Sequence, residues 1–214
     1  MPSAQGRLSI EEKFALCQQV FAEAQLPLIF RITPMSEPQT LDSWLEVRRL
    51  RVLEDTRVMV NGDLSIAHTL SAAAGHQPAA GADIPPSRRS SARCVARRCR
   101  NSRPSAQRLE LSPVPFEGWV LRRSGESVVI ACGQTAAEAD MVGLYDVFTA
   151  SDARNSGWAR KLCAQLLRAR TATWRSRGYL QVDASNLPAR SVYRRLALTM
   201  PTLYHYRTDA RQIE

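Results

Sequence analysis

One stretch of this chain combines residue types that could hold an anion. It runs from Gly143 to Arg160 and reads as a strand, a short polar turn and a helix with Gly157 in its first turn. A helix N-terminus presents N–H groups without intrahelical partners, so it binds phosphate where no side chain blocks the approach. Gly157 and Ala159 keep that approach open, and Arg154 adds a charged donor. The stretch is a candidate phosphate site, although many such turns bind nothing.

A second group of polar residues surrounds the next predicted helix, which begins at Pro188. Residues 186–196 read NLPARSVYRRL, with Asn186 just before the helix and Tyr193 within it. Each also has an ordinary structural interpretation, because asparagine is a common helix N-cap and tyrosine a common core aromatic. From the residues alone, both interpretations stay open.

Together the two segments resemble the GNAT superfamily of N-acetyltransferases. Residues 154–159, RNSGWA, match the R/Q-x-x-G-x-G/A signature, which in this family stands between a strand and a helix. The later segment resembles N-x-x-A-x-x-x-Y-x-x-x-G-F and agrees at Asn186, Ala189 and Tyr193. The resemblance covers about Phe116 to Arg207 and implies an α/β fold with a mixed sheet, acetyl-CoA as the acyl-donor cosubstrate and an amine as the acceptor.

The resemblance also implies roles for individual residues. Tyr193 would protonate the leaving thiolate of the coenzyme, and Asn186 would contact the coenzyme arm. A main-chain N–H at Val147 or Phe148 would stabilise the oxyanion. The pyrophosphate would be held by Arg154, Asn155, Ser156, Gly157, Trp158, Ala159 and Arg160.

The general base is less clearly indicated. Asp146, Glu138 and Asp183 could each take a proton from the amine, directly or through water. Most surface carboxylates are solvated and not catalytic, so the sequence does not rank them firmly. We take Asp146 as the catalytic candidate beside Tyr193, and we predict no metal site.

The segment departs from the family pattern after Tyr193. Ala197-Leu198 stands where the family usually has Gly-Phe. Alanine adopts a positive φ less cheaply than glycine does, so an altered turn is expected here, with consequences for the placement of Tyr193.

The elements that must position these residues can be read from periodicity and turn signals. The first 62 residues predict helix, strand, helix and strand, starting with a capping box at Ser9 and Glu12. A hairpin, a strand, a long helix, a strand, a helix and a last strand follow, and this order favours a mixed sheet packed by helices. The predicted ranges are 10–25, 28–32, 41–50, 56–60, 118–123, 127–133, 142–149, 157–175, 179–182, 188–198 and 203–206.

Three domains are predicted from changes in composition and periodicity along the chain. Residues 1–63 look like the trailing half of another GNAT repeat, as in tandem family members, but contain no R-x-x-G-x-G/A turn. Residues 64–110 are rich in Arg, Ala and Ser and predict an irregular linker, of which 91–109 could be an arginine-rich helix. Residues 111–214 would be the catalytic GNAT domain.

Charge and cysteine content exclude several other functions. The net charge is +9, but residues 84–109 contain eight arginines and no acid, which leaves 21 basic against 20 acidic residues elsewhere. This segment could be a nucleic-acid arm, but it lacks aromatic residues for base stacking, so nucleic acid is not an expected partner. The five scattered cysteines predict free thiols in a reducing cytoplasm.

The sequence predicts a cytoplasmic enzyme without a signal peptide or membrane span. It would transfer the acetyl group of acetyl-CoA to an amine-bearing small molecule or peptide by direct attack. The alternative is a catalytically impaired GNAT-like module that binds coenzyme or a partner. The oligomeric state is not indicated.

Overall fold

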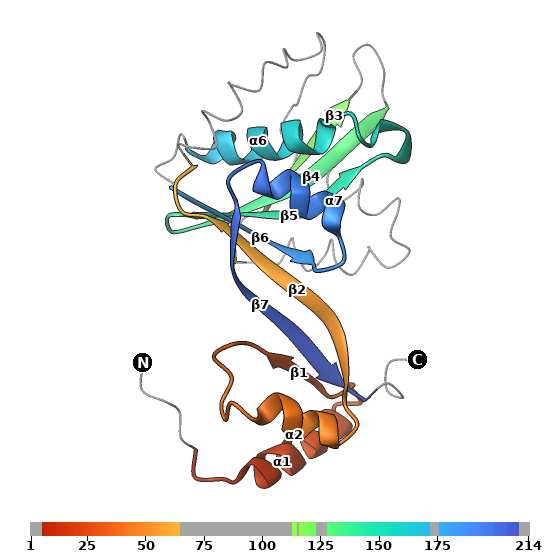
Figure 1. Ribbon diagram of the computed structural model, residues 1–214, viewed down its shortest axis with the longest axis vertical. Coiled ribbons are helices and arrows are strands. Elements are labelled where there is room, and N and C mark those ends of the chain that lie inside the picture. The colour runs from red at the N-terminus through yellow and green to blue at the C-terminus, as the bar shows by residue number, and fades with distance from the viewer. Residues whose placement is uncertain (1–5, 65–112, 115, 123–127, 172–175, 210–214) are drawn as a thin grey trace. The chain divides into compact units, whose positions relative to one another are not determined.

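The computed structural model describes residues 6–64, 113–114, 116–122, 128–171 and 176–209, with backbone only from 169 to 171. The predicted linker, residues 64–110, lies outside this part of the chain except for Leu64, as does the predicted arginine-rich helix. Figure 1 labels the elements. In chain order they are α1 (Ile10–Glu23), β1 (Ile29–Ile32), α2 (Leu41–Val47), β2 (Arg51–Asn61), β3 (Phe116–Arg122), β4 (Val129–Glu138), β5 (Met141–Thr149), the 3-10 helix η1 (Ser151–Ala153), α6 (Trp158–Thr171), β6 (Arg177–Asp183), α7 (Leu187–Arg194) and β7 (Thr199–Thr208).

Two compact units make up the chain. The first consists of residues 1–56 and 203–214, and the second of residues 57–202, so that β2 and β7 contribute residues to both. The strand order of the sheet is β1-β7-β2-β6-β5-β4-β3. Because β4 is antiparallel to β3 and β5 while β6 is parallel to β5, the predicted mixed α/β sheet is confirmed.

The first unit begins with the predicted capping box. The Glu12 main-chain N–H donates to the Ser9 hydroxyl at 3.1 Å, and the Ser9 N–H donates to the Glu12 carboxylate at 2.6 Å. The Phe14 ring of α1 stacks on Phe30 of β1 and meets Trp44 of α2 edge-on, with ring centroids 5.7 and 5.3 Å apart. These contacts cover a small core of Ile32, Leu45 and Leu50.

Asp42 of α2 forms an ion pair with Arg207 in this unit. Thr40 occupies the N-cap of α2 without a side-chain hydrogen bond. The Asp42 carboxylate instead accepts two hydrogen bonds from Arg207, at 2.8 and 3.0 Å, and lies 2.7 Å from His205 Nε2. The Arg207 side chain is only 6% exposed, and its third bond goes to the Leu50 carbonyl. A largely buried cation is therefore paired by a bidentate carboxylate.

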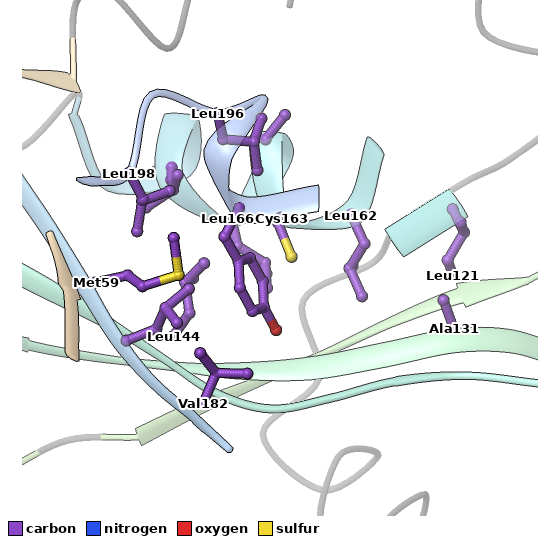
Figure 2. Packing of buried hydrophobic residues seen from close by; sticks show 14 of the residues in the cluster. Met59, Leu121, Ala131, Leu144, Leu162, Cys163, Leu166, Val182, Leu196 and Leu198 are labelled. Carbon is purple, nitrogen blue, oxygen red and sulfur yellow. The ribbon is translucent and has the colours of Figure 1, made fainter. Parts of the chain in front are cut away.

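In the second unit, α6 and α7 pack on one face of the sheet. Figure 2 shows Leu162, Cys163 and Leu166 of α6 beside Leu196 and Leu198, above the sheet residues Leu144 and Val182. Burial of each large side chain in this cluster stabilises the folded state by about 1.5–3 kcal/mol. This packing fixes both helices against β4, β5 and β6, and thereby the two segments singled out in the sequence.

Candidate functional site

The parallel pairing of β5 and β6 covers only part of each strand. Met141 to Leu144 pair with Arg177 to Leu180, whereas β5 continues to Thr149 and β6 to Asp183. From Tyr145 onwards, β5 is therefore paired with β4 but separates from β6. This fork places main-chain groups of β5 at the edge of an opening in the sheet.

A β-bulge distorts β5 immediately beyond the fork. Gln134 pairs with Tyr145 and Cys132 with Phe148, so Gly133 alone faces the two residues Asp146 and Val147. Asp146 accommodates the extra residue in a left-handed conformation, with φ of 49°. Aspartate tolerates this conformation better than most residues, and bulges often redirect a side chain.

The bulge separates two neighbouring side chains onto opposite faces of the sheet. A Cβ built on Gly133 would meet Leu166 of α6 at 3.2 Å and Val147 at 3.5 Å, so Val147 lies on the helix-covered face. Gln134, the next residue of β4, points to the other face, where its Nε2 donates to Asp146 Oδ2 at 3.0 Å.

The turn before α6 has the backbone of an anion cradle. Asn155 and Gly157 both have positive φ, 60° and 78°, and a Cβ added to Gly157 would meet nothing within 4 Å. The first helical hydrogen bond runs from Lys161 N to the Gly157 carbonyl at 3.0 Å, so the N–H groups of residues 158–160 have no partner within the helix. The first turn of α6 contains no acidic residue. These features favour bound phosphate.

A groove of about 1160 Å³ joins this turn to the end of β5 and to α7, and we call it the α6–α7 groove. It brings together every residue that the sequence proposed for coenzyme binding, and also Tyr193; Asp146 is not among its lining residues. The groove is lined by Val147, Phe148, Thr149, Ala153, Arg154, Asn155, Ser156, Gly157, Trp158, Ala159, Arg160, Asn186, Pro188, Ala189, Ser191, Val192, Tyr193 and Arg195.

Arg195 is a groove residue that sequence reasoning missed. It adds a third guanidinium to those of Arg154 and Arg160. Helical spacing could have found it, since Arg195, the C-cap residue of α7, follows Ala189 and Val192 at intervals of three. Its neighbour Arg194 does not line the groove.

Asn186 caps α7 and also lines the groove. Its Oδ1 accepts from the Ala189 N–H at 3.2 Å and so caps α7. Because the same side chain lines the groove, capping and an approach to a ligand are compatible.

Tyr193 lies at the inner wall of the groove and is 8% exposed. Burial, with a smaller effect of Cys163, raises the pKa of the Tyr193 hydroxyl well above its ordinary value. The tyrosine therefore keeps its proton at neutral pH and can donate it to a group in the groove.

The turn that follows Tyr193 contradicts the expectation of an altered geometry. The Leu198 N–H donates to the Tyr193 carbonyl at 3.1 Å and the Ala197 N–H to the Arg194 carbonyl at 3.0 Å, which is the Schellman pattern of a helix end. Ala197 itself has φ of 58°. The chain forms the turn that glycine usually supplies, with the conformational cost carried by alanine. The same turn ends α7 at Arg194, before the predicted limit at Leu198.

The three candidate bases have different surroundings. Desolvation raises the pKa of the Asp146 carboxyl above its ordinary value. Hydrogen bonds from the Ser185 side chain and main chain lower the pKa of Asp183, which makes Asp183 a weaker base. Glu138 pairs with Met141 at the closed end of the β4–β5 hairpin, away from the bulge. Asp146 directly precedes Val147, which lines the groove, and the Asp183 carbonyl accepts from the N–H of Asn186, another groove residue.

Comparison with protein-family models gives a match to the Acetyltransferase (GNAT) family over residues 91–197, half of the chain. The chain belongs to the GNAT family. The matched region begins within the predicted linker and contains the fork, the bulge, the glycine turn and α7. Comparison with curated proteins gave no match.

Solved structures similar to this GNAT chain show the same fold. A tandem GNAT protein from the clavulanic acid biosynthesis pathway has a TM-score of 0.73 at 11% identity, covering 96% of this chain and 71% of its own. A GCN5-related N-acetyltransferase from Kribbella flavida has a TM-score of 0.65 at 17% identity, covering 95% and 77%. A functionally unknown conserved protein from Staphylococcus epidermidis has a TM-score of 0.69 at 9% identity, covering 93% and 80%.

In the described residues of this GNAT chain, no helix is long and apolar enough to cross a membrane.

Proposed function

We propose that this protein is an N-acetyltransferase that moves the acetyl group of acetyl-CoA to an amine by direct attack. The observation that carries the proposal is the α6–α7 groove. It combines an anion cradle around Gly157, a buried protonated tyrosine and the open end of β5. Phosphate, thiolate and thioester carbonyl are the three parts of acetyl-CoA that such groups would recognise.

The cradle would hold the pyrophosphate of the coenzyme. Main-chain N–H groups from Asn155 to Arg160 would donate to phosphate oxygens, and the side chains of Arg154 and Arg160 would neutralise charge. A Cβ at position 157 would meet nothing within 4 Å, so a side chain introduced there would project into the open space of the cradle. Asn186, which lines the groove from α7, would contact the coenzyme arm through its amide nitrogen.

Transfer would require no covalent enzyme intermediate. The amine nitrogen attacks the thioester carbonyl, forming a C–N bond, while a main-chain N–H at Val147 or Phe148 stabilises the oxyanion. The intermediate collapses with cleavage of the C–S bond, and Tyr193 protonates the departing thiolate. The amine proton passes to Asp146, directly or through one water.

A titration of acetyl-CoA into the purified protein, followed by calorimetry, tests the donor site. We expect micromolar binding by the wild type and none by Gly157→Glu, because the substitution places bulk and negative charge in the cradle. Gly157→Ala is the matched control, because it places a side chain at the same positive φ of 78° without the bulk and charge of glutamate. No binding by a folded wild-type protein, or equal loss in both variants, would refute the donor assignment.

Turnover is then measured as CoA release with a panel of primary amines: a polyamine, an aminoglycoside and a peptide with a free amino terminus. Binding without release of CoA from any of them would favour the alternative, a module that binds the coenzyme without catalysis. One argument for that alternative was an altered turn after Tyr193. The left-handed Ala197 removes this argument, because the turn keeps its helix-ending hydrogen bonds.

A further inference from the structure

Gln134 is a buried amide next to the proposed base. It lies in the middle of β4, is 2% exposed, and donates from Nε2 to Asp146 Oδ2 at 3.0 Å. A buried polar side chain costs free energy unless it is hydrogen-bonded. The pairing with Asp146 is the hydrogen bond that the structure gives to the Gln134 amide.

The backbone on both sides of Asp146 is held in place by packing. The preceding Tyr145 ring meets Phe116 edge-on at 5.2 Å, contacts Tyr179 through both hydroxyls, and covers Gly143 so closely that a Cβ there would collide with it. The following Val147 packs against the Gly133 and α6 side of the sheet. What remains to be fixed is the direction of the Asp146 carboxylate, which its own side-chain torsions would otherwise leave open.

We propose that Gln134 is a positioning residue for acetyl transfer: its hydrogen bond to Oδ2 of Asp146 orients the carboxylate so that Oδ1 faces the incoming amine. In the described part of the chain, Oδ1 has no hydrogen-bond partner. This inference rests on the proposed function, because it assumes that Asp146 is the base.

The same hydrogen bond affects the basicity of Asp146. A donor to a carboxylate favours its charged form, whereas desolvation favours the neutral form. The titratable and charged groups that share this face of β4, β5 and β6 are Cys132, Glu138, Tyr145, Arg177, Tyr179 and Asp183. Burial is the cause that raises the pKa of Asp146. Gln134 donates the hydrogen bond to this carboxylate, so removal of Gln134 should change the ionisation of Asp146.

The test is a pH titration of the aspartate side-chain carbons by carbon-13 NMR in the full chain, which needs no acceptor. Comparison with Asp146→Asn assigns the Asp146 signal. We expect Gln134→Met, which keeps the length of the side chain without the donor, to raise the pKa of Asp146 by about 0.5–1 unit. Gln134→Glu should raise it further, because two neighbouring carboxyls share a proton. An unchanged pKa in both variants would overturn the proposal.

Thr135→Val is the matched control. Thr135 is the adjacent residue of β4, it is fully buried, and its hydroxyl has no hydrogen-bond partner among the described residues. This variant removes a buried polar group on the opposite face of the strand, so the pKa of Asp146 should stay at its wild-type value. An equal shift in Thr135→Val would mean that any disturbance of β4 moves Asp146, and the positioning role would be refuted.

Kinetics with acetyl-CoA and the panel amine that gives turnover separate the two proposals. Gln134→Met should move the acidic limb of the kcat/KM profile to higher pH, and should have no further effect in an Asp146→Asn background. If Asp146→Asn leaves activity and profile unchanged, the assignment of the base fails. If Asp146→Asn is impaired while Gln134→Met follows the wild type, only the role of Gln134 fails. A Gln134→Met chain that does not fold leaves the decision to Gln134→Glu.

Discussion

Replacing Ala197 with glycine should stabilise the protein, which is the opposite of what glycine does in most regular structure. Ala197 has φ of 58° at the end of α7. A left-handed conformation costs a non-glycine residue about 1–2 kcal/mol. Glycine avoids that cost but gives the unfolded chain more freedom, which offsets roughly 0.4–1 kcal/mol.

The loss of one half-buried methyl group offsets a few tenths of a kcal/mol more, about half of the ~0.8 kcal/mol of a fully buried one. The net gain should be about 0.5 kcal/mol, equivalent to an increase of roughly 1–2 °C in Tm for a chain of this size. Because the helix-ending hydrogen bonds of Ala197 and Leu198 are main-chain bonds, glycine keeps them. KM for acetyl-CoA should therefore stay within about twofold of the wild-type value, a difference below about 0.4 kcal/mol.

The assay is urea denaturation followed by circular dichroism, with Ala164→Gly as the paired variant. Ala164 is a buried residue within α6, where glycine should cost about 1 kcal/mol. The two alanine-to-glycine changes, both in the second unit, should therefore change the free energy of unfolding in opposite directions. If Ala197→Gly lowers the midpoint as Ala164→Gly does, the left-handed turn and the argument for the placement of Tyr193 are wrong.

Three further outcomes follow from the charges and burial of named side chains. The Arg207 guanidinium holds the pKa of Asp42 down at about 2, so the stabilisation from Asp42 is full above the ordinary value of 3.8 and is lost as pH falls toward 2. Asp42→Asn should lower the free energy of unfolding by about 1 kcal/mol at neutral pH, a value reduced for solvent screening because the Asp42 side chain is 37% exposed. In thermal melts, the Tm values of the variant and the wild type should converge near pH 2. Tyr193→Phe should lower kcat about 100-fold with little change in KM. The kcat of the wild type should not fall through loss of the Tyr193 proton until the pH is above 10, because burial raises the pKa of this hydroxyl. Arg195→Met should weaken acetyl-CoA binding about tenfold in calorimetry, whereas Arg194→Met, an equal change of charge outside the groove, should not. Equal losses in the two arginine variants, a basic limb below pH 10, or a pH-independent deficit in Asp42→Asn would each contradict the corresponding argument.

Local chemistry explains why much of the fold was readable in the sequence. The capping box at Ser9 and Glu12 needs residues three apart, and it forms as predicted. Gly157 in the sequence predicts an open approach to the N-terminus of α6, and a Cβ at this position would meet nothing within 4 Å. Asn186 is the N-cap residue of α7 and Tyr193 lies within this short helix, so that their common approach to the groove follows from helical spacing.

Long-range pairing explains what the sequence could not provide. The sequence of residues 131–149 does not indicate that β4 and β5 pair with a bulge. This register places Gln134 next to Asp146 and Val147 on the opposite face of the sheet. Asp42 lies in the first turn of α2, whereas its partner Arg207 lies at the other end of the chain, so local spacing does not indicate this ion pair.

The sequence by itself determined the order of helices and strands, the glycine turn and the residue types of the groove, because each depends on neighbours within a few positions. Only the tertiary structure decided which carboxylate adjoins the open end of β5, and that alanine takes a glycine-like conformation after Tyr193. These depend on strand register and on the rotation of packed helices, which arise from contacts between residues far apart in the chain.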